Sequence, residues 1–456
     1  MRFVPDCIKL RVQRGKYCLC TLDFLWRRVW REKKDAYTRG KLKARVWRGK
    51  KDVYTRGRWK ARVWRGKKRF YTRGRLKMWV WRGKKDVYTR GRLKMWVWIE
   101  KKDVYTRGKL KARVWRRKRV YMDEKNMTTA DAKATQEAKE LLKYLKNTAG
   151  QQIITGQHTQ TIPCEEIDYI RQTTGREPKL RGFELLAYSP NINYADASTE
   201  CLKEVEENKG TVETALQWAR ANRPDKVNDT GTENSTDYTT GGILTLSFHW
   251  FSPIGGRDKS FYTEHTDFDA TKVLQEGTPE RAAFYADMDV IADILRRFQD
   301  ENIPILWRPF HESYGTWFWW GAKGAEVARD LYRLMFDYYT GEKNLHNLLW
   351  VWNCDIEEAY PGDEYVDVVS IDVYLPEYQA TDYADAYEKL VAATSRDKVA
   401  ALAEVGYLPD VELLQKSRIP WAYYMTWSKE FCIGEKYNSV EKLKKMYDSE
   451  YAVTLL

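Results

Sequence analysis

The chain has 456 residues, which is enough for more than one domain and for a large core. Its net charge of +15 averages two different regions, because residues 1–120 carry 44 Lys and Arg against 8 Asp and Glu, whereas the other 336 residues carry 35 against 56. No apolar run is long enough for a transmembrane helix, and the first 20 residues lack the apolar core of a signal peptide. The seven cysteines show no zinc-binding spacing, and a Cys164–Cys201 disulfide is possible but not derivable.

The first 121 residues form a tandem repeat close to VWRGKKDVYTRGRLKMW. Tryptophans recur every 17 residues, at Trp30, Trp47, Trp64, Trp81, Trp98 and Trp115. Short apolar pieces alternate with glycine and charge, so β-hairpins are conceivable. The favoured interpretation is a translated DNA repeat or unselected extension, with Met122 or Met127 as the true start. A basic tail that binds anionic polymers such as nucleic acid, or a folded repeat, stays open.

From about residue 128, eight apolar runs alternate with helical patterns. Strands that are almost wholly apolar and separated by helices indicate a parallel sheet covered on both faces. We therefore predict that residues 122–456 form an α/β fold, a (β/α)8 TIM barrel with long loops, with an open doubly wound sheet as the alternative. No glycine-rich phosphate motif follows any strand. The predicted strands are 152–156, 180–187, 242–249, 303–310, 348–353, 366–374, 398–404 and 421–427.

Two long insertions interrupt this pattern. Residues 222–240 are rich in Asn, Asp, Thr and Gly without apolar periodicity, which indicates an irregular loop. Residues 252–277 contain several aromatic side chains and follow the third strand, so we expect them to line the rim of a site at that end of the barrel.

A glutamate closes each of two apolar runs, Glu312 after the fourth predicted strand and Glu404 at the end of the seventh. The carboxyl ends of barrel strands are where such enzymes carry out their chemistry. Retaining glycoside hydrolysis requires two carboxyl groups about 5–5.5 Å apart, one as acid and one as nucleophile. A single glutamate at a strand end is more often a surface carboxylate, but two on facing strands favour catalysis.

Several motifs resemble those of glycoside hydrolase family 26, from about Ala130 to the C-terminus. The family consists mostly of endo-β-1,4-mannanases with a (β/α)8 barrel and catalytic glutamates on strands four and seven. The matching stretches are Trp307–Glu312, Trp317–Gly321, Gly156–His158, His249, Ile371–Tyr374, Leu402–Glu404 and Trp427.

This resemblance implies a role for each matching residue. Glu312 would be the general acid/base and Glu404 the nucleophile. His311 would orient the acid and contact the sugar in the −1 subsite, Arg308 would keep the nucleophile ionised, and Tyr374 would hydrogen-bond to it.

Further residues would bind substrate. Trp427 would support the −1 sugar, and Trp317 would serve the acceptor side. His249 and Trp250 would line the donor side, with Glu184 as a weaker candidate. His158, His249 and part of the Trp317–Trp320 cluster could instead be structural, and Trp350 and Trp352 are more often core residues. No metal or organic cofactor is implied.

The leading functional hypothesis is a retaining endo-β-1,4-mannanase that acts as a monomer on mannan, galactomannan or glucomannan. The stretch Ser428–Phe431 resembles the eighth-strand loop of mannanases. A mixed-linkage β-glucanase or xylanase of the same family is the alternative. A non-catalytic carbohydrate-binding protein, or binding of anionic polymers through the repeat, represents another class of function. The resemblance implies a secreted or envelope-attached protein, and no nucleic acid partner for the catalytic domain.

Overall fold

The protein is described by a computed structural model that covers residues 128–159, 164–229 and 232–455, together with eight strands between residues 19 and 115. The chain divides into two compact units, Met1–Asp123 and Glu124–Leu456. Each unit is described separately below. In the described part of the chain, no helix is long and apolar enough to cross a membrane.

The described strands of the first unit pair in parallel, with the repeat in register. From β3 to β6, each residue pairs with the equivalent residue of the next 17-residue unit, as Tyr54 does with Tyr71. The possibility of β-hairpins is therefore wrong for these strands, because hairpins would pair them antiparallel. The strands are β1 (Leu19–Thr21), β2 (Trp26–Val29), β3 (Ala36–Val46), β4 (Val53–Trp64), β5 (Lys68–Trp81), β6 (Lys85–Trp98), β7 (Val104–Arg107) and β8 (Leu110–Trp115).

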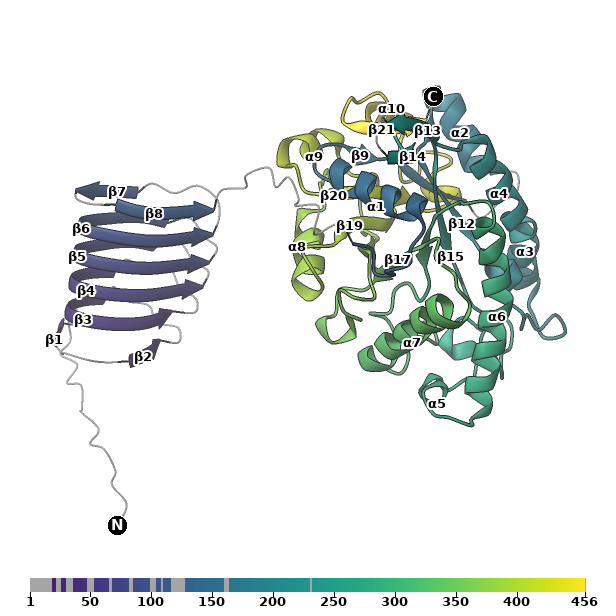
Figure 1. The fold of residues 1–456 in the computed structure, drawn as a ribbon, viewed down its shortest axis with the longest axis horizontal. Coiled ribbons are helices and arrows are strands. Elements are labelled where there is room, and N and C mark those ends of the chain that lie inside the picture. Colours follow the sequence, from purple (N-terminus) through teal and green to yellow (C-terminus); the bar gives the residue numbers. More distant parts are fainter. Residues whose placement is uncertain are drawn as a thin grey trace, which may run out of the picture. The chain divides into compact units, whose positions relative to one another are not determined.

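The second unit is a closed barrel of eight parallel strands surrounded by helices, as predicted (Figure 1). Pairing of Gln157 in the first strand with Thr426 in the last closes it. In order, the strands are β10 (Gly156–Thr159), β12 (Leu180–Glu184), β15 (Ile243–Ser247), β16 (Ile305–Arg308), β17 (Leu348–Asn353), β18 (Val368–Val373), β19 (Val399–Val405) and β20 (Trp421–Thr426). The first predicted strand, 152–156, contains β9 (Ile153–Ile154), which pairs in parallel with β20 at Tyr423, and the first long barrel strand, β10, begins at its last residue.

The helices follow the alternating pattern of the sequence. Thr278 caps α6 by accepting a hydrogen bond from the Arg281 N–H, and Pro279 occupies the first turn, which are common helix-start signals. The helices are α1 (Gln136–Thr148), α2 (Glu165–Thr174), α3 (Thr199–Asn208), α4 (Thr211–Ala221), α5 (Ala270–Val273), α6 (Pro279–Gln299), α7 (Ala325–Asp337), α8 (Ala384–Ala393), α9 (Val411–Ser417) and α10 (Val440–Tyr447).

The two insertions have more structure than expected. Residues 222–240 contain an antiparallel pair, β13 (Asp225–Asp229) and β14 (Thr232–Asp237), so the prediction of an irregular loop is wrong there. Residues 252–277 contain α5 and pair with the loop after β16, since the Thr263 N–H donates to the Trp317 carbonyl at 2.7 Å. This second insertion therefore lies at the carboxyl end of the barrel, as expected.

Two apolar clusters hold the barrel together. One lies between the strands and the surrounding helices. In the other, Leu141, Leu142 and Leu145 of α1 pack against strand residues such as Leu306 and Val368.

Cys164, Cys201, Cys354 and Cys432 are buried in the barrel as free thiols, so the Cys164–Cys201 disulfide is not formed. Burial raises the pKa of each thiol, to about 12 for Cys201 and Cys354.

Candidate active site

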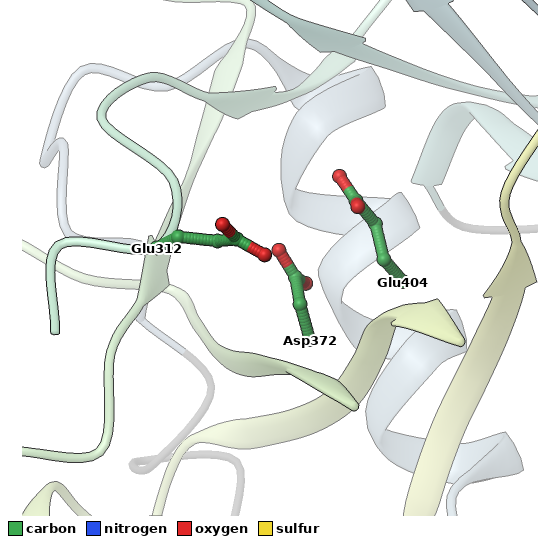
Figure 2. A group of neighbouring side chains, drawn as sticks. All are labelled: Glu312, Asp372 and Glu404. Atoms are coloured by element: carbon green, nitrogen blue, oxygen red, sulfur yellow. The ribbon is translucent and has the colours of Figure 1, made fainter. Parts of the chain in front are cut away.

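Three carboxyl groups meet at the carboxyl ends of the strands. Glu312 follows β16, Asp372 lies on β18 and Glu404 on β19, and Figure 2 shows Asp372 between the two glutamates. One oxygen of each lies within 4.8 Å of one oxygen of the others. This separation matches the short spacing of retaining glycosidases, because inverting enzymes keep their carboxyl groups about 6.5–9.5 Å apart.

A tight turn directs Glu312 into the site. Phe310 and Glu312 both have left-handed backbones, with φ of 48° and 52°, which non-glycine residues adopt at a cost of about 1–3 kcal/mol. The Glu312 N–H donates to Asn353 Oδ1 at 2.7 Å, which holds the turn in place. The Trp317 indole N–H donates to Glu312 Oε2 at 2.7 Å, so this carboxyl receives a neutral donor.

Glu404 is brought beside Asp372 by a register shift. Ile371 pairs with Leu402, whereas Asp372 pairs with Glu404, so one extra residue sits in β19. Such a bulge re-aims the side chains that follow it. Glu404 is 4% exposed and accepts hydrogen bonds from Arg308 Nη2 and, at 2.7 Å, from the Tyr374 hydroxyl.

Arg308 connects the nucleophile candidate to Asp372. Its Nη1 donates to Asp372 Oδ2 at 2.9 Å while Nη2 donates to Glu404, and the guanidinium is 1% exposed. Asn353 Nδ2 donates to Asp372 Oδ1 at 2.8 Å. The sequence motif contained Asp372, but no role followed from it, because only the fold shows that Arg308 lies between these carboxylates. A cation shared by the three carboxylates would have to compete with this guanidinium.

One arginine cannot neutralise three neighbouring carboxylates. Burial and Asp372 raise the pKa of Glu312 to about 7, opposed mainly by the Trp317 hydrogen bond. Burial and Asp372 also raise the pKa of Glu404, to about 8, against the charge of Arg308. These values belong to a coupled pair, so the free site keeps a proton near neutral pH. The donors place that proton on Glu312, because Glu404 receives the charged Arg308 guanidinium, whereas the Trp317 indole and the Tyr314 hydroxyl that bond to Glu312 are neutral.

A second buried network lies beside the carboxylates. Glu184 is fully buried and accepts from the His249 N–H at 2.7 Å and the Ser247 hydroxyl at 2.8 Å, and its Oε2 lies 2.9 Å from His249 Nδ1. His249 holds the pKa of Glu184 at about 2 despite burial, and Glu184 in turn raises the pKa of His249. His249 Nε2 lies 3.1 Å from His311 Nε2, and burial lowers the pKa of His311.

Comparison with known proteins gives this site a family. The sequence model of glycosyl hydrolase family 26 matches residues 214–455. The chain belongs to this family. A mannan endo-1,4-β-mannosidase of Thermothelomyces thermophilus is 34% identical over 338 residues, covering 72% of this chain and 62% of that protein. A mannan endo-1,4-β-mannosidase of Bacillus subtilis is 26% identical, covering 64% of this chain and 78% of that protein.

Solved structures of similar proteins agree with the fold. A β-(1,4)-mannanase of Podospora anserina, with a family 26 and a CBM35 part, is 33% identical with a TM-score of 0.61, covering 72% of this chain and 68% of that one. A β-mannanase from a symbiotic protist of the termite Reticulitermes speratus is 28% identical with a TM-score of 0.60, covering 72% and 96%. The chain spans 50% to 62% of the length of the first curated relatives it matches.

Two tryptophans of this family 26 site lie where sugars can reach them. Trp427 is half-buried and stacks on His158, with ring centroids 4.0 Å apart and planes at 26°. Trp317 is 43% exposed beside Glu312. Aromatic faces pack well on the C–H faces of sugars. These positions fit the predicted roles, Trp427 as a platform for the −1 sugar and Trp317 on the acceptor side.

Two expected substrate contacts, Trp250 and Glu184, are wrong as direct contacts. Trp250 is 2% exposed, packs on Phe284 and donates its N–H to Asp287, so it belongs to the core. Its neighbour His249 faces the site, because successive residues of an extended chain point to opposite sides. Glu184, fully buried, acts behind His249.

His311 differs from expectation in a similar way. It is 1% exposed and bonds to His249 rather than to Glu312. Trp317 and Asn353 therefore orient the acid, and the Asn353 contribution was missed because nothing in the sequence shows that β17 faces the Glu312 turn.

Proposed function

We propose that the chain is a retaining endo-β-1,4-mannanase in which Glu312 is the general acid/base and Glu404 the nucleophile. The single observation that carries this proposal is the pair of differently hydrogen-bonded glutamates whose oxygens lie within 4.8 Å of each other. That spacing leaves no room for a water between sugar and base, which an inverting reaction requires.

In the first step, the ionised Glu404 attacks the anomeric carbon. Glu312 gives its proton to the leaving glycosidic oxygen, so the C–O bond breaks as the glycosyl–enzyme bond forms. Glu404 loses its negative charge as the ester forms. Arg308 keeps Asp372 as its partner at 2.9 Å, so no buried cation is left unpaired in the intermediate.

In the second step, the deprotonated Glu312 acts as base toward water. The charge of Glu312 raises the pKa of Glu404. Because repulsion between two carboxylates is mutual, an ionised Glu404 also disfavours the ionised form of Glu312, and esterification of Glu404 removes that repulsion. The pKa of Glu312 then falls, which favours its role as base. Water attacks the anomeric carbon, its proton passes to Glu312, and Glu404 leaves as a carboxylate.

Mannan is the proposed substrate because several similar curated proteins are named mannan endo-1,4-β-mannosidases. The solved termite-symbiont relative is described as a complex with gluco-manno-oligosaccharide. Mixed-linkage β-glucan and xylan are the alternatives to be tested in parallel.

The test is reducing-sugar release by the wild-type chain and by Glu404→Gln on galactomannan, mixed-linkage β-glucan and xylan. We expect release from mannan alone, and a loss of at least about 10⁴-fold in the variant. Proton NMR of the first product should show the β-anomer. Release of the α-anomer would contradict retention, and no release from any polymer would contradict the proposal.

We also infer a monomer that works outside the cell, because a polymeric substrate does not enter cells. Size-exclusion chromatography with light scattering tests the first statement. Activity in the medium of a host expressing the gene with its own flanking sequence tests the second. A dimer, or activity confined to the cells, would contradict them.

A further inference from the structure

Five aromatic side chains form a continuous row that begins at the nucleophile. Tyr374, whose hydroxyl binds Glu404, leads to Phe431, Tyr437, Tyr407 and Tyr378. Successive ring centroids are 5.3, 4.2, 5.3 and 5.7 Å apart. The members follow β18, β19 and β20, so the row lies at the same end of the barrel as the carboxylates.

The row is accessible along its length. Tyr374 is 42% exposed at one end and Tyr378 is 43% exposed at the other, while the three members between them are half-buried. Rings that served only to pack loops together would gain from burying these ends. A contiguous exposed set of aromatic side chains next to an active site is typical of a binding surface.

A buried asparagine makes the loops that carry the row rigid. Asn438 is 1% exposed; it donates to the carbonyls of Gly406 and Phe431 at 2.9 and 2.8 Å and accepts from the Leu408 N–H at 2.8 Å. The Tyr383 hydroxyl donates to the Tyr407 carbonyl at 2.7 Å. The loops after β19 and β20 are thus joined before any ligand arrives, which lowers the entropy cost of binding.

Gly406 allows the row to reach the active site. A Cβ at this position would lie 3.2 Å from Tyr374 Cδ1 and 3.3 Å from Phe431 Cε1, closer than ordinary contacts. The absence of a side chain lets both rings pack on the backbone just beyond β19, two residues after Glu404. The first two rings of the row are therefore held against the strand that carries the nucleophile.

We propose that this aromatic row binds further pyranose units of a β-linked glycan, beyond the sugars that flank the cleaved bond. Aromatic rings pack on the C–H faces of successive sugars, and tyrosine hydroxyls supply hydrogen bonds. Lys442 Nζ lies over the Tyr378 ring, 3.1 Å from its centre, and Lys436 Nζ lies 5.2 Å from the centre of the Tyr437 ring. Each ammonium covers one face of its ring, so a sugar would pack on the other face or on the edge and could accept a hydrogen bond from the lysine. The inference rests on the proposed function, because the glycan that occupies the row is the one being hydrolysed.

The kinetic test uses β-1,4-manno-oligosaccharides of increasing length with the full chain. In the wild type, kcat/KM should rise as the oligosaccharide becomes long enough to cover the row, since remote binding lowers the barrier. Tyr437→Ala and Tyr378→Ala should each lose roughly two- to tenfold in kcat/KM on the long oligosaccharides and leave the shortest cleaved one unchanged.

Tyr365→Ala is the matched control. Tyr365 is also half-buried beneath a cation, Arg333, but precedes β18 and so lies at the opposite end of that strand from Tyr374. It should show no length-dependent loss. Equal losses at every length in the row variants, or no loss at any length, would overturn the inference.

A binding test separates this inference from the proposed activity. The row variants are placed on the Glu404→Gln background, and retardation in native gels containing galactomannan, mixed-linkage glucan or xylan is measured. If the wild type hydrolysed none of the three polymers but the row variants were retarded less than their Glu404→Gln parent, the proposed function would be wrong and the row would remain a glycan site. If the wild type hydrolyses mannan but the row variants show unchanged retardation and unchanged length dependence, only the inference about the row is wrong.

Discussion

The two ends of the barrel use the same strands for different purposes. At the carboxyl end, Arg308, Asp372 and Glu404 are charged groups packed within hydrogen-bonding distance and almost without water. At the amino end, Leu142 and Leu145 of α1 pack on apolar strand residues. The first arrangement places several buried charges at the reacting groups, and the apolar burial of the second offsets the free-energy cost of burying them.

Two aspartates of adjoining segments make the contrast sharper. Asp367, just before β18, and Asp372, within it, are both buried carboxylates. Asp367 accepts backbone N–H groups of Ala130 and Trp350 at 2.7 and 2.9 Å and lies near the α1 end of the barrel. Asp372 instead shares Arg308 with Glu404. These two buried carboxylates, five residues apart, therefore differ in function. Asp367 accepts hydrogen bonds from the backbone and stabilises the fold, whereas Asp372 contacts the groups that would react.

Among the changes that compare the two ends, the largest effect should follow from removing the acid. Glu312→Ala should lower kcat on mannan by roughly 10²–10⁴-fold, because the leaving sugar oxygen then departs without a proton. An aryl mannoside with an acidic phenol needs no such proton, so its first step should be nearly unaffected. Burst kinetics with the aryl substrate measure that step. If both substrates lose equally, Glu312 is not the acid.

The opposite end should respond in stability rather than activity. Asp367→Ala leaves two buried N–H groups without an acceptor, which should lower the free energy of unfolding by about 2–5 kcal/mol. Urea unfolding measures this, and kcat at a temperature where the variant is folded should match the wild type. Asp367→Asn retains an acceptor and should lose less. A large fall in kcat with an unchanged free energy of unfolding would contradict the idea that this end of the barrel serves stability alone.

A smaller effect should follow from neutralising Asp372. Its charge raises the pKa of both Glu312 and Glu404, so Asp372→Asn should lower both. Glu312 must be protonated in the first step, and the alkaline limb of kcat/KM should therefore move to lower pH. The measurement is the pH profile of kcat/KM on a soluble manno-oligosaccharide. An unchanged or upward-shifted limb would show that Asp372 does not set these pKa values.

The smallest effect is expected from removing the repeat. A chain of residues 122–456 keeps the whole compact barrel unit, so its kcat/KM on mannan should stay within about twofold of the full chain. Binding to heparin or DNA, if the full chain shows it, should disappear, because the excess of Lys and Arg lies in residues 1–120. Loss of hydrolysis would show that the barrel depends on the repeat.

Much of the fold followed from apolar runs, and the differences have physical causes. Strands such as β17 and β19 are continuously buried and apolar, so their positions were predicted closely. At the first strand, the apolar pattern marked Ile153–Ile154, which form β9, but not β10, whose sequence Gly-Gln-His-Thr is polar although it is buried. The Gln157 amide of β10 donates to the Thr426 carbonyl, a contact that sequence alone does not show. The β13–β14 pair has no apolar alternation to reveal it.

The site shows where sequence reasoning ends. From the strand count and the motif resemblance, we predicted that Glu312, Glu404, Arg308 and Tyr374 lie in one site. In the structure, Arg308 and Tyr374 both bond to Glu404, and Glu312 lies nearby. Side-chain direction was not available from the sequence, so Trp250 was expected to face substrate. The hydrogen bonds that connect Asp372, Arg308 and Glu404 join three strands and depend on a β-bulge, which no local sequence pattern predicts.

The free thiols of the barrel have a practical consequence. Burial raises the pKa of all four described barrel cysteines, so little reactive thiolate exists at neutral pH. Neither reducing agents nor air should change the covalent structure of this unit. The barrel can accordingly be produced, stored and used under either redox condition. Because its own cysteines are buried, a cysteine introduced at the surface would react first and could be used for labelling or immobilisation.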